Sequence, residues 1–518
     1  NAAEQKRLVA YVAAVAETIE PLAIKQFLRE KLPDYMVPAK VEWLKALPLT
    51  ANGKVDKRAL PEPQWGAPQN QESAPNSQTA IEKTLIDIFS TLLPAKSVGI
   101  YDNFFELGGD SIIAMQIVSR AAQSGLTLSP KQLFQYQTVA ELARVAEEGS
   151  RTSVSQSLAT GNVSLTPIQH WFFEQSLAEP QHFNQSVTLT LPDGFDRDAL
   201  ERAIAHLYSH HDALRLRFSS TDNGWQQAFS EEITPPTVHW FEFAQLSLSE
   251  QNNAIAQKSK TLQASLNLQA GPLVSVSIFD LGKTQPSQLF IAVHHLVIDG
   301  VSWRILLADL QQAYQQALAG GPIQLAAKTH SYQKWAQELA QVARSPEIEA
   351  EFVFWSAIAK TTAASSPQNT LSQSGKQLNN TIEQNTIEHS QTAITTHSAA
   401  LTQSLLQEVP SVYNTQITEA LLTAFAQTLT QWTEQPTTLI NLESYGRFSE
   451  KLDRSRTVGW FTALYPALLT FDTTDSLSNY FKSIKSQLRA VPNQGISYGL
   501  LRYLRNTAED SLSEKLET

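Results

Sequence analysis

"LFIAVHHLVIDGVSW" spans residues 289–303 and places two adjacent histidines, His294 and His295, at the end of an apolar run. The run contains β-branched residues, which is typical of a buried strand. A loop with Asp299 and Gly300 follows, and the segment after it has the spacing of a helix. The stretch therefore predicts a buried strand, a loop and a helix, with a site where the strand ends.

The histidine pair indicates how such a site is built. Neighbouring residues on a strand face opposite sides, so one imidazole can face the site while the other packs. For the same reason His294 and His295 cannot both ligate one ion from a strand, and Asp299 is four residues further on. We therefore predict no metal site here.

The composition limits the class of protein. The chain has 518 residues, of which 17% are charged and 42% hydrophobic, as in a soluble globular protein of roughly two to four domains. A formal net charge of −11 disfavours nucleic acid and anionic membranes as partners. No run of about 18 apolar residues predicts a membrane span. The absence of cysteine excludes disulfides and thiol catalysis and fits a cytoplasmic protein. Because the chain starts at Asn1 without Met or a signal-like segment, we expect it to be a piece of a longer protein.

Polar stretches divide the chain. Residues 62–78 are rich in Pro, Gln, Asn and Ser, and residues 147–162 are also polar, which is typical of linkers. A third polar tract at 361–397 either separates two lobes of the last region or forms a long mobile loop.

The segment between the two linkers has the pattern of a small helix bundle. Thr79 and Glu82 form a capping-box pattern, and Thr138 with Glu141 repeats it further on. Another helix is predicted to start at Ser111, where backbone N–H groups and the helix dipole favour an anion. By position alone, an N-cap role is the simpler explanation of this serine.

The string "DNFFELGGDSIIAMQIVSRA" at 102–121 favours a different role. It closely resembles the thiolation motif of peptidyl carrier proteins from nonribosomal peptide synthetases. The resemblance implies that a phosphopantetheinyl transferase attaches 4′-phosphopantetheine to Ser111, and that the thiol of this arm carries an amino acid or peptide. An attachment point needs no neighbouring base, and the arm supplies the thiol that this chain lacks. Asp110 stands where most carriers have His, and Asp is typical of carriers that feed an epimerization domain.

The N-terminal segment resembles the end of an amino-acid adenylation domain, through "LPDYMVPA" at 32–39 and "LPLTANGKVDKRAL" at 47–60. In that family a lysine of the last motif contacts the substrate carboxylate and phosphate, and Lys54 matches it. Without the resemblance, Lys54 would be an ordinary surface lysine. The pattern also predicts an amphipathic helix from Ile24 and a strand around Val41. The ATP-binding core is missing from this sequence, so we expect no adenylation by this chain alone.

Residues 289–303 resemble the HHxxxDG motif that condensation and epimerization domains share. The resemblance implies two α/β lobes of the chloramphenicol acetyltransferase type that meet at a tunnel. It places His295 toward the tunnel, gives His294 a supporting role, and makes Asp299 mainly structural, paired with an arginine.

Other stretches resemble the epimerization branch in particular. "VSWRIL" at 301–306 has the Ser-Trp spelling typical of that branch, which makes Trp303 a supporting residue. "NLESYGRFSEKLDRSRTVGWFTALYP" at 441–466 places Glu443 where the branch has a catalytic Glu, with Arg447 in a supporting position. The family usually has Glu-Gly-His-Gly-Arg there, so the Ser-Tyr of this chain predicts altered packing around the site without loss of function.

Three shorter matches complete the comparison. "LTPIQHWFFE" at 165–174 and "PNQGISYGLLRY" at 492–503 also fit the epimerization branch, whereas "HHDALRLRF" at 210–218 is common to both branches. The family's closing Phe-Asn-Tyr-Leu-Gly motif does not occur before Thr518, so we expect the last domain to be incomplete at its end.

The chemistry of epimerization explains why these groups are needed. The α-proton leaves from one face of the carbon and another returns to the opposite face, so two acid/base groups are the simplest arrangement. His295 suits neutral pH, whereas Glu443 needs a raised pKa, which a tunnel can give by desolvation. A thioester makes the α-proton more acidic, and no metal or redox cofactor is required.

The sequence therefore predicts L-to-D epimerization of an aminoacyl or peptidyl thioester on the chain's own carrier, in antibiotic-type secondary metabolism. The alternatives are a condensation domain, which would share His295, and a silent docking domain. Expected partners are the carrier with its tethered substrate, a phosphopantetheinyl transferase, the missing adenylation core and a downstream condensation domain. The predicted segments are a small α+β adenylation tail (1–61), a linker (62–78), a four-helix carrier bundle (79–146), a linker (147–162), and the N-lobe (163–360) and C-lobe (361–518) of the epimerization domain.

Overall fold

The structure is a computed structural model. It describes residues 9–13, 24, 38, 40–44, 47–48, 60–61, 79–93, 98–102, 104, 107, 109, 111–128, 132–133, 136–148, 154–222, 224–282, 285–364, 390–413, 415–447, 452–471 and 476–505. The chain forms two compact units, residues 1–77 with 396–417 and residues 78–395 with 418–518. Within the described residues, no helix has the length and apolar character needed to cross a membrane.

The first unit contains a parallel pair of strands, β1 (Val9–Ala13) and β2 (Lys40–Leu44). Strand β2 confirms the strand predicted around Val41, whose side chain is buried. The unit also contains a segment of short helical elements, α14 (Ala399–Gln403), η7 (Ser404–Glu408) and α15 (Val409–Tyr413). Of the predicted amphipathic helix only Ile24 is described, and Lys54 with its turn lies outside the described residues.

Residues 79–148 form the predicted helix bundle around a core of their own. Its described helices are α2 (Ala80–Leu92), α3 (Ser111–Gln123) and α5 (Val139–Val145), and β3 (Leu126–Thr127) pairs with β4 (Glu147–Glu148). Leu85, Phe89 and Ile117 are fully buried in this core. The capping box of Thr79 and Glu82 is present, since each residue's side chain accepts a hydrogen bond from the backbone N–H of the other.

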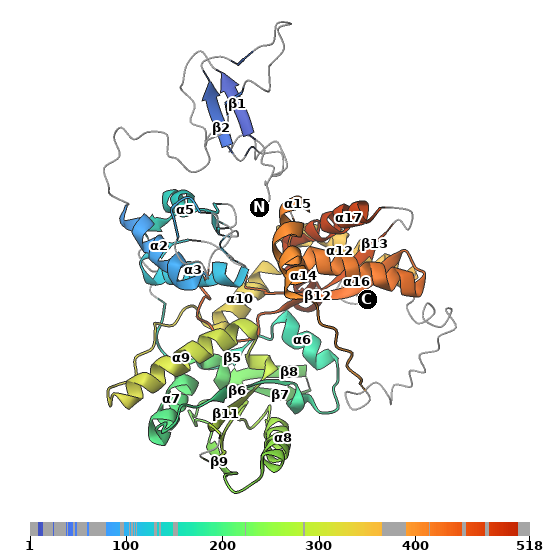
Figure 1. Cartoon of the computed structure of the whole chain (residues 1–518). Coiled ribbons are helices and arrows are strands. Elements are labelled where there is room, and N and C mark those ends of the chain that lie inside the picture. The colour runs from blue at the N-terminus through green and yellow to red at the C-terminus, as the bar shows by residue number, and fades with distance from the viewer. Residues whose placement is uncertain are drawn as a thin grey trace. The chain divides into compact units, whose positions relative to one another are not determined.

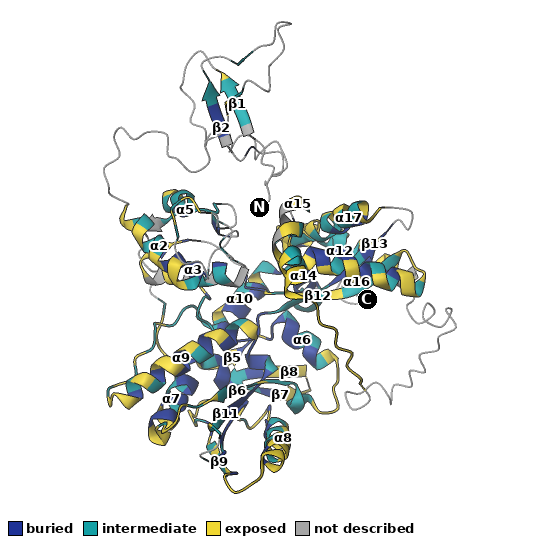
Figure 2. Ribbon diagram, in the orientation of Figure 1, coloured by how far each residue is buried: buried dark blue, intermediate teal, exposed yellow. Residues whose placement is uncertain are grey.

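The large α/β region is built on a four-stranded sheet. Its order is β6 (Asn184–Thr190), β11 (Gln288–His294), β10 (Val274–Asp280) and β9 (Val238–Glu242). The predicted strand is β11, and it ends at His294 as expected. The two inner strands, β10 and β11, are buried along almost their whole length, whereas the outer strands β6 and β9 are intermediate or exposed (Figure 2). Helix α8 (Leu248–Ala264) packs on β10 and β11, while α7 (Arg197–His210) packs on α9 (Gly300–Leu318) (Figure 1).

Two smaller sheets complete the region. One has the order β5 (Asn162–Val163), β8 (Gly224–Phe229) and β7 (Leu216–Thr221), and the other pairs β12 (Thr437–Ser444) with β13 (Ala463–Thr470). Apolar residues of α16 (Ile417–Thr433), β13 and α17 (Leu477–Arg489) form one core cluster. The remaining helical elements are η2 (Pro180–His182), η3 (Asp212–Arg215), η4 (His295–Val297), α6 (Pro167–Glu174), α10 (Tyr332–Val342), α11 (Pro346–Ala350), α12 (Phe352–Ala364), η8 (Pro492–Gly495), α18 (Ile496–Gly499) and η9 (Leu500–Leu504).

The main core joins residues from both sides of the polar tract at 361–397. Val293 and Trp355 belong to it, and so do Phe461 and Leu500 from the C-terminal side. Helix α12 continues to Ala364, and residues 365–389 lie outside the described part. The predicted polar linker before this region contacts it: Gln156 Nε2 donates to the Lys328 carbonyl at 3.1 Å, and its Oε1 accepts from Lys328 N at 2.8 Å.

Candidate active site

His294 is a buried structural residue. Its Nε2 donates to the carbonyl oxygen of Pro180 at 2.9 Å, and its Nδ1 accepts from the backbone N–H of Leu296 at 3.2 Å. Burial lowers the pKa of His294 to about 4. Both ring nitrogens are therefore occupied, and the imidazole is neutral at physiological pH.

His295 directly follows β11, and its side chain is half-buried. The imidazole stacks on Phe183, with 5.3 Å between ring centroids, and lies 4.5 Å from the ring of Trp460. The backbone N–H of His295 donates to Phe183 O at 3.0 Å, which holds the residue beside the start of β6. The adjacent histidines therefore face different surroundings, one the core and the other an aromatic wall.

Burial lowers the pKa of His295 below its ordinary value. Backbone groups of His295 and Ile298 oppose this shift, and so do the negative charges of Asp299 and Glu443. An imidazole in this environment favours the neutral form, which is the form that accepts a proton.

Gln185 contacts His295, and the sequence analysis did not identify it. Its Nε2 lies 2.8 Å from Nε2 of His295, and its Oε1 accepts from the indole N–H of Trp303 at 2.9 Å. The contact arises because β6 pairs antiparallel with β11, with Gln185 opposite Val293. Strand pairing between such distant segments leaves no local signal in the sequence.

Asp299 joins the start of α9 to the C-terminal half. As N-cap of α9 it accepts from Ser302 N at 2.7 Å. Its two oxygens accept from Nη2 of Arg447 at 3.1 and 3.2 Å, and Oδ2 also accepts from Phe461 N at 3.2 Å. The arginine expected opposite Asp299 is therefore Arg447, whose side chain is almost completely buried.

The Ser-Trp dipeptide has two separate sets of contacts. Ser302 Oγ donates to Gly459 O at 2.9 Å and accepts from Gly459 N at 3.1 Å and from Arg447 Nη2 at 2.9 Å. Trp303 instead contacts Gln185. Consecutive helical side chains point in different directions, so one dipeptide supports both the C-terminal loop and the histidine.

The Gly-Arg of "ESYGR" also has a clear physical reason. Gly446 has φ +59°, and a Cβ at this position would lie 1.6 Å from the carbonyl oxygen of Phe461. Only glycine avoids that contact. The next residue, Arg447, then reaches Asp299. Tyr445 of the Ser-Tyr pair is 47% exposed, and the altered packing predicted for this pair stays a prediction.

Glu443 lies on β12 opposite Leu464 of β13. Its charge raises the pKa of His295, so the two predicted acid/base groups are close enough to interact. The expected desolvation of Glu443 is not found in the described structure. Glu443 is exposed because it lies, with exposed Asn441, on a face of β12 that the described residues leave open.

Three of the predicted motifs meet around one cavity of about 210 Å³. Trp460 lines this cavity and also contacts His295, so the cavity adjoins the histidine. Glu174 at its edge accepts from Arg502 at 2.9 Å and from the Tyr503 hydroxyl at 2.6 Å. The lining residues from the three motifs are Thr166, Pro167, Ile168, Trp171, Glu174, Asn441, Trp460, Phe461, Thr462, Ala463, Leu464, Tyr465, Ile496, Tyr498, Gly499, Arg502 and Tyr503.

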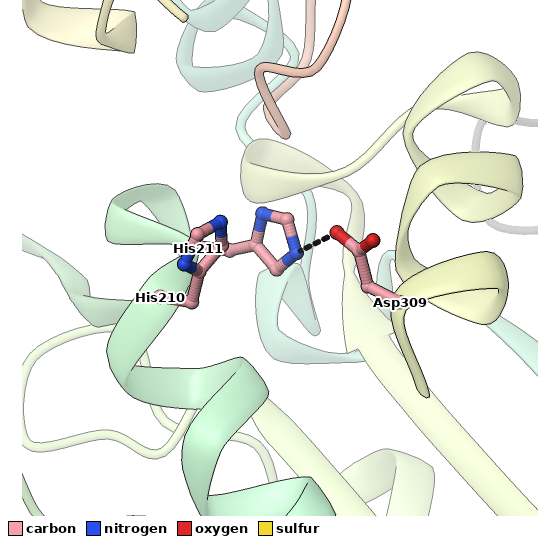
Figure 3. A group of neighbouring side chains, drawn as sticks. All are labelled: His210, His211 and Asp309. Carbon is pink, nitrogen blue, oxygen red and sulfur yellow. Dashed lines mark ion pairs between the residues drawn. The ribbon is translucent and has the colours of Figure 1, made fainter. Parts of the chain in front are cut away.

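A separate group of potential metal ligands lies away from this site. Among the described residues, His210, His211 and Asp309 have donor atoms within 4.8 Å of one another (Figure 3). His211 Nε2 lies 3.1 Å from one oxygen of Asp309, and Arg456 pairs with the other. A cation would compete with this arginine for the carboxylate. The contacts present instead join His211 at the end of α7 and Arg456 through one carboxylate of α9, that of Asp309.

The segment around Ser111 fits an attached phosphate group. Ser111 is the first residue of the 13-residue helix α3, where backbone N–H groups lack helical partners. Gly109 approaches Phe104 so closely that a Cβ would lie 2.3 Å from the ring.

Family models match three parts of the chain. The condensation domain matches residues 159–517, the phosphopantetheine attachment site residues 83–146, and the AMP-binding enzyme C-terminal domain residues 2–54. These matches follow the order of the segments predicted from the sequence.

Similar proteins include two subunits of linear gramicidin synthase from Brevibacillus parabrevis. Linear gramicidin synthase subunits C and D are 45% and 44% identical to this chain, each over 97% of it, but the chain spans only 6% and 10% of their lengths. Among solved structures, the epimerization domain from the third module of tyrocidine synthetase B is 31% identical, with a TM-score of 0.58. That similarity covers 71% of this chain and 79% of the solved one.

Proposed function

The chain belongs to the condensation-domain family of nonribosomal peptide synthetases, and from this premise we propose that it inverts the α-carbon of an aminoacyl or peptidyl group held on its own carrier. The carrier segment is a phosphopantetheine attachment domain, so 4′-phosphopantetheine is its covalent cofactor. The observation that carries the proposal is that one cavity adjoins both acid/base candidates, His295 and Glu443. Its lining residue Trp460 contacts His295, and its lining residue Asn441 is two residues before Glu443 on β12. The two candidates come from opposite sides of the polar tract, and the charge of one acts on the other.

In this proposal, one acid/base residue of this chain serves each face of the α-carbon. His295 exchanges a proton with one face of the α-carbon, and Glu443 exchanges a proton with the opposite face. Asp299 and Arg447 fix the start of α9 and therefore the loop that presents His295. The phosphopantetheine thiol, when bound on Ser111, presents the substrate as a thioester, whose α-proton is more acidic than that of an amide.

Peptide-bond condensation is the second candidate, since it would use the same histidine. The carboxylate at Glu443, the Ser302-Trp303 spelling and the likeness to a solved epimerization domain favour inversion instead. A silent docking role is disfavoured because the HHxxxDG residues are all present and hydrogen-bonded.

The test loads the L and D forms of one aminoacyl-phosphopantetheine onto Ser111 in separate samples. The wild-type chain should bring both samples toward the same mixture, measured by chiral analysis after release. His295→Ala and Glu443→Gln should each leave both isomers near their starting form, because every turnover needs one removal and one return. Glu231→Gln, which changes an exposed carboxylate on a distant loop, is the matched control and should behave as wild type.

Exchange of the α-proton in deuterated water separates the two groups. A variant that lacks one of them can still incorporate deuterium from the remaining face while it retains configuration. If Glu443→Gln inverts the substrate at the wild-type rate, the two-base proposal is wrong and the condensation reading gains support.

A further inference from the structure

We infer that Trp303 and Gln185 are positioning residues that keep Nε2 of His295 unprotonated, so that the imidazole is held as a free base with its lone pair at that nitrogen. The inference concerns the acid/base histidine of the proposed function and rests on that function for its catalytic meaning. Neither residue is needed to touch the substrate, since both act through His295.

The hydrogen-bond chain fixes the direction of each contact. An indole N–H can only donate, so the Gln185 atom at 2.9 Å from Trp303 Nε1 is the carbonyl oxygen. The other end of the same amide is then the NH₂ group, which also only donates. That group lies 2.8 Å from Nε2 of His295, so this nitrogen accepts. A neutral imidazole with an accepting Nε2 carries its proton on Nδ1.

The tryptophan is therefore the residue that sets the tautomer. Without its N–H, the Gln185 amide could turn over and present its oxygen to His295, and the histidine could then donate from a protonated Nε2. Trp303 is buried on α9, and its neighbour Ser302 is hydrogen-bonded to Gly459, so the indole has a fixed position. The hydrogen bond from Trp303 to the Gln185 carbonyl oxygen therefore fixes which end of the amide faces His295.

The charged groups around the imidazole raise the pKa of His295, whereas the Gln185 donor is expected to lower it. Asp299 and Glu443 favour the protonated ring, whereas His294 is neutral and Arg447 already pairs with Asp299. The rings of Phe183 and Trp460 carry no charge and cover the imidazole faces. The donor from Gln185 thus opposes two carboxylates, and it does so at the one nitrogen that would receive a proton.

A proton that arrives on Nε2 would face the NH₂ group of Gln185. Two donors would then point at each other until the amide rotates, and that rotation breaks the hydrogen bond to Trp303. The pair therefore disfavours a resting imidazolium and favours return of the proton. The pair thus keeps His295 unprotonated between turnovers, and Nε2 takes a proton only when the Gln185 amide moves off its lone pair.

The direct test is the protonation state of His295 in the intact chain. The protein labelled with ¹⁵N-histidine is measured by long-range ¹H–¹⁵N spectra, and the signal among the 11 histidines is assigned with His295→Gln. The expected neutral form has the proton on Nδ1 and an unprotonated Nε2. A neutral form with the proton on Nε2 overturns the inference, whatever the activity of the enzyme.

Two variants test the cause. Trp303→Phe keeps an aromatic ring but removes the N–H, and it should raise the pKa of His295 by about one pH unit in the same spectra. Gln185→Glu offers an accepting carboxylate and should raise that pKa further. Trp240→Phe is the matched control: it removes an indole N–H that donates to Glu201 at 3.1 Å elsewhere, and it should leave His295 unchanged.

Exchange of the α-proton links the spectra to catalysis. In Trp303→Phe, the apparent pKa of the acid limb in the pH profile of this exchange should rise by the same amount as the pKa of His295 in the spectra. A purely structural loss would instead lower the rate at every pH. An unmoved pKa in a folded Trp303→Phe variant contradicts the inference. If the chain fails to epimerize but the spectra behave as expected, the proposed function fails and the positioning role of the pair remains.

Discussion

Two adjacent histidines of one chain differ here in almost every physical respect. His294 uses both ring nitrogens inside the core, and its pKa is lowered to about 4. His295 lies half-buried between two aromatic rings, with one nitrogen against an amide. Strand alternation predicts that one histidine packs while the other faces the site. The burial decides which of them does so.

The buried histidine predicts a pH dependence of stability. Between pH 6.5 and pH 4 the unfolded chain binds a proton at His294 and the folded chain does not, so stability falls as the pH is lowered through this window. The contribution amounts to roughly 3 kcal/mol at most. Urea unfolding of the wild type at a series of pH values should show this loss.

His294→Asn should flatten the slope, because an amide does not titrate, although it lowers stability at neutral pH. His239→Asn, which changes an exposed histidine of β9, is the control and should keep the full slope. Some slope should remain in His294→Asn, because burial also lowers the pKa of His210 to about 4. A slope identical to that of the wild type would show that His294 is not the titrating group.

The sequence identified the proposed acid/base residues more readily than the residues that contact them. His295, Asp299 and Glu443 stand in recognisable strings, and Asp299 has the arginine partner expected for it, Arg447. Gln185 was missed because its contact depends on the register of β6 against β11, which local patterns do not encode. The desolvation expected for Glu443 was wrong in the described structure, since exposure depends on what covers β12.

At the scale of elements, the turn after β12 is constrained by one close contact. Gly446→Ala should destabilise the chain by about 2–5 kcal/mol, because a methyl group would collide with the backbone of Phe461 at a positive φ. Gly161→Ala is the matched control. Gly161 also has a positive φ, +79°, but has no atom within 4 Å of the added carbon.

Urea midpoints of the two variants measure the difference. The control should lose only the conformational cost of about 1–2 kcal/mol. Equal losses in both variants would mean that the contact with Phe461 has no consequence.

The ion pair between α9 and this turn should also be important for stability. Arg447→Met leaves Asp299 buried without its partner and should cost about 3–5 kcal/mol. Arg505→Met removes a pair with Glu349, whose side chain is 62% exposed, and should cost below about 1 kcal/mol.

Thermal or urea unfolding of both variants gives the comparison. The loss of unfolding free energy should be larger in Arg447→Met than in Arg505→Met, because water reaches Glu349 but not Asp299. A small loss in Arg447→Met would show that another group or water compensates Asp299.

Element prediction succeeded where the pattern is local. The apolar run before His294 became β11, and the capping box at Thr79 became the start of α2. What the sequence could not supply was the pairing of distant strands. For the same reason, the meeting of residues 165–174, 441–466 and 492–503 around one cavity was not predicted.

For the whole molecule, the carrier and the α/β region have separate hydrophobic cores. The proposed reaction requires a tether between them, and Ser111 at the start of α3 is the proposed attachment point. Incubation with a phosphopantetheinyl transferase and coenzyme A should add one arm to the wild type, measured by intact mass.

Ser111→Ala should add none. Ser124→Ala, which changes an exposed serine just after the same helix, should still add one arm. Addition of an arm to Ser111→Ala would show that phosphopantetheine is attached to another residue.

The contacts of residues 299–303 with residues 446–461 have a consequence for protein engineering. Asp299 and Ser302 are complementary to Arg447, Gly459 and Phe461, although the two segments are far apart in the chain. A chimera that exchanges only one half with a homologue would combine a donor from one parent with an acceptor from the other. Hybrid synthetases should therefore retain activity when both segments come from the same parent, that is, when the crossover lies before residue 299 or after residue 461.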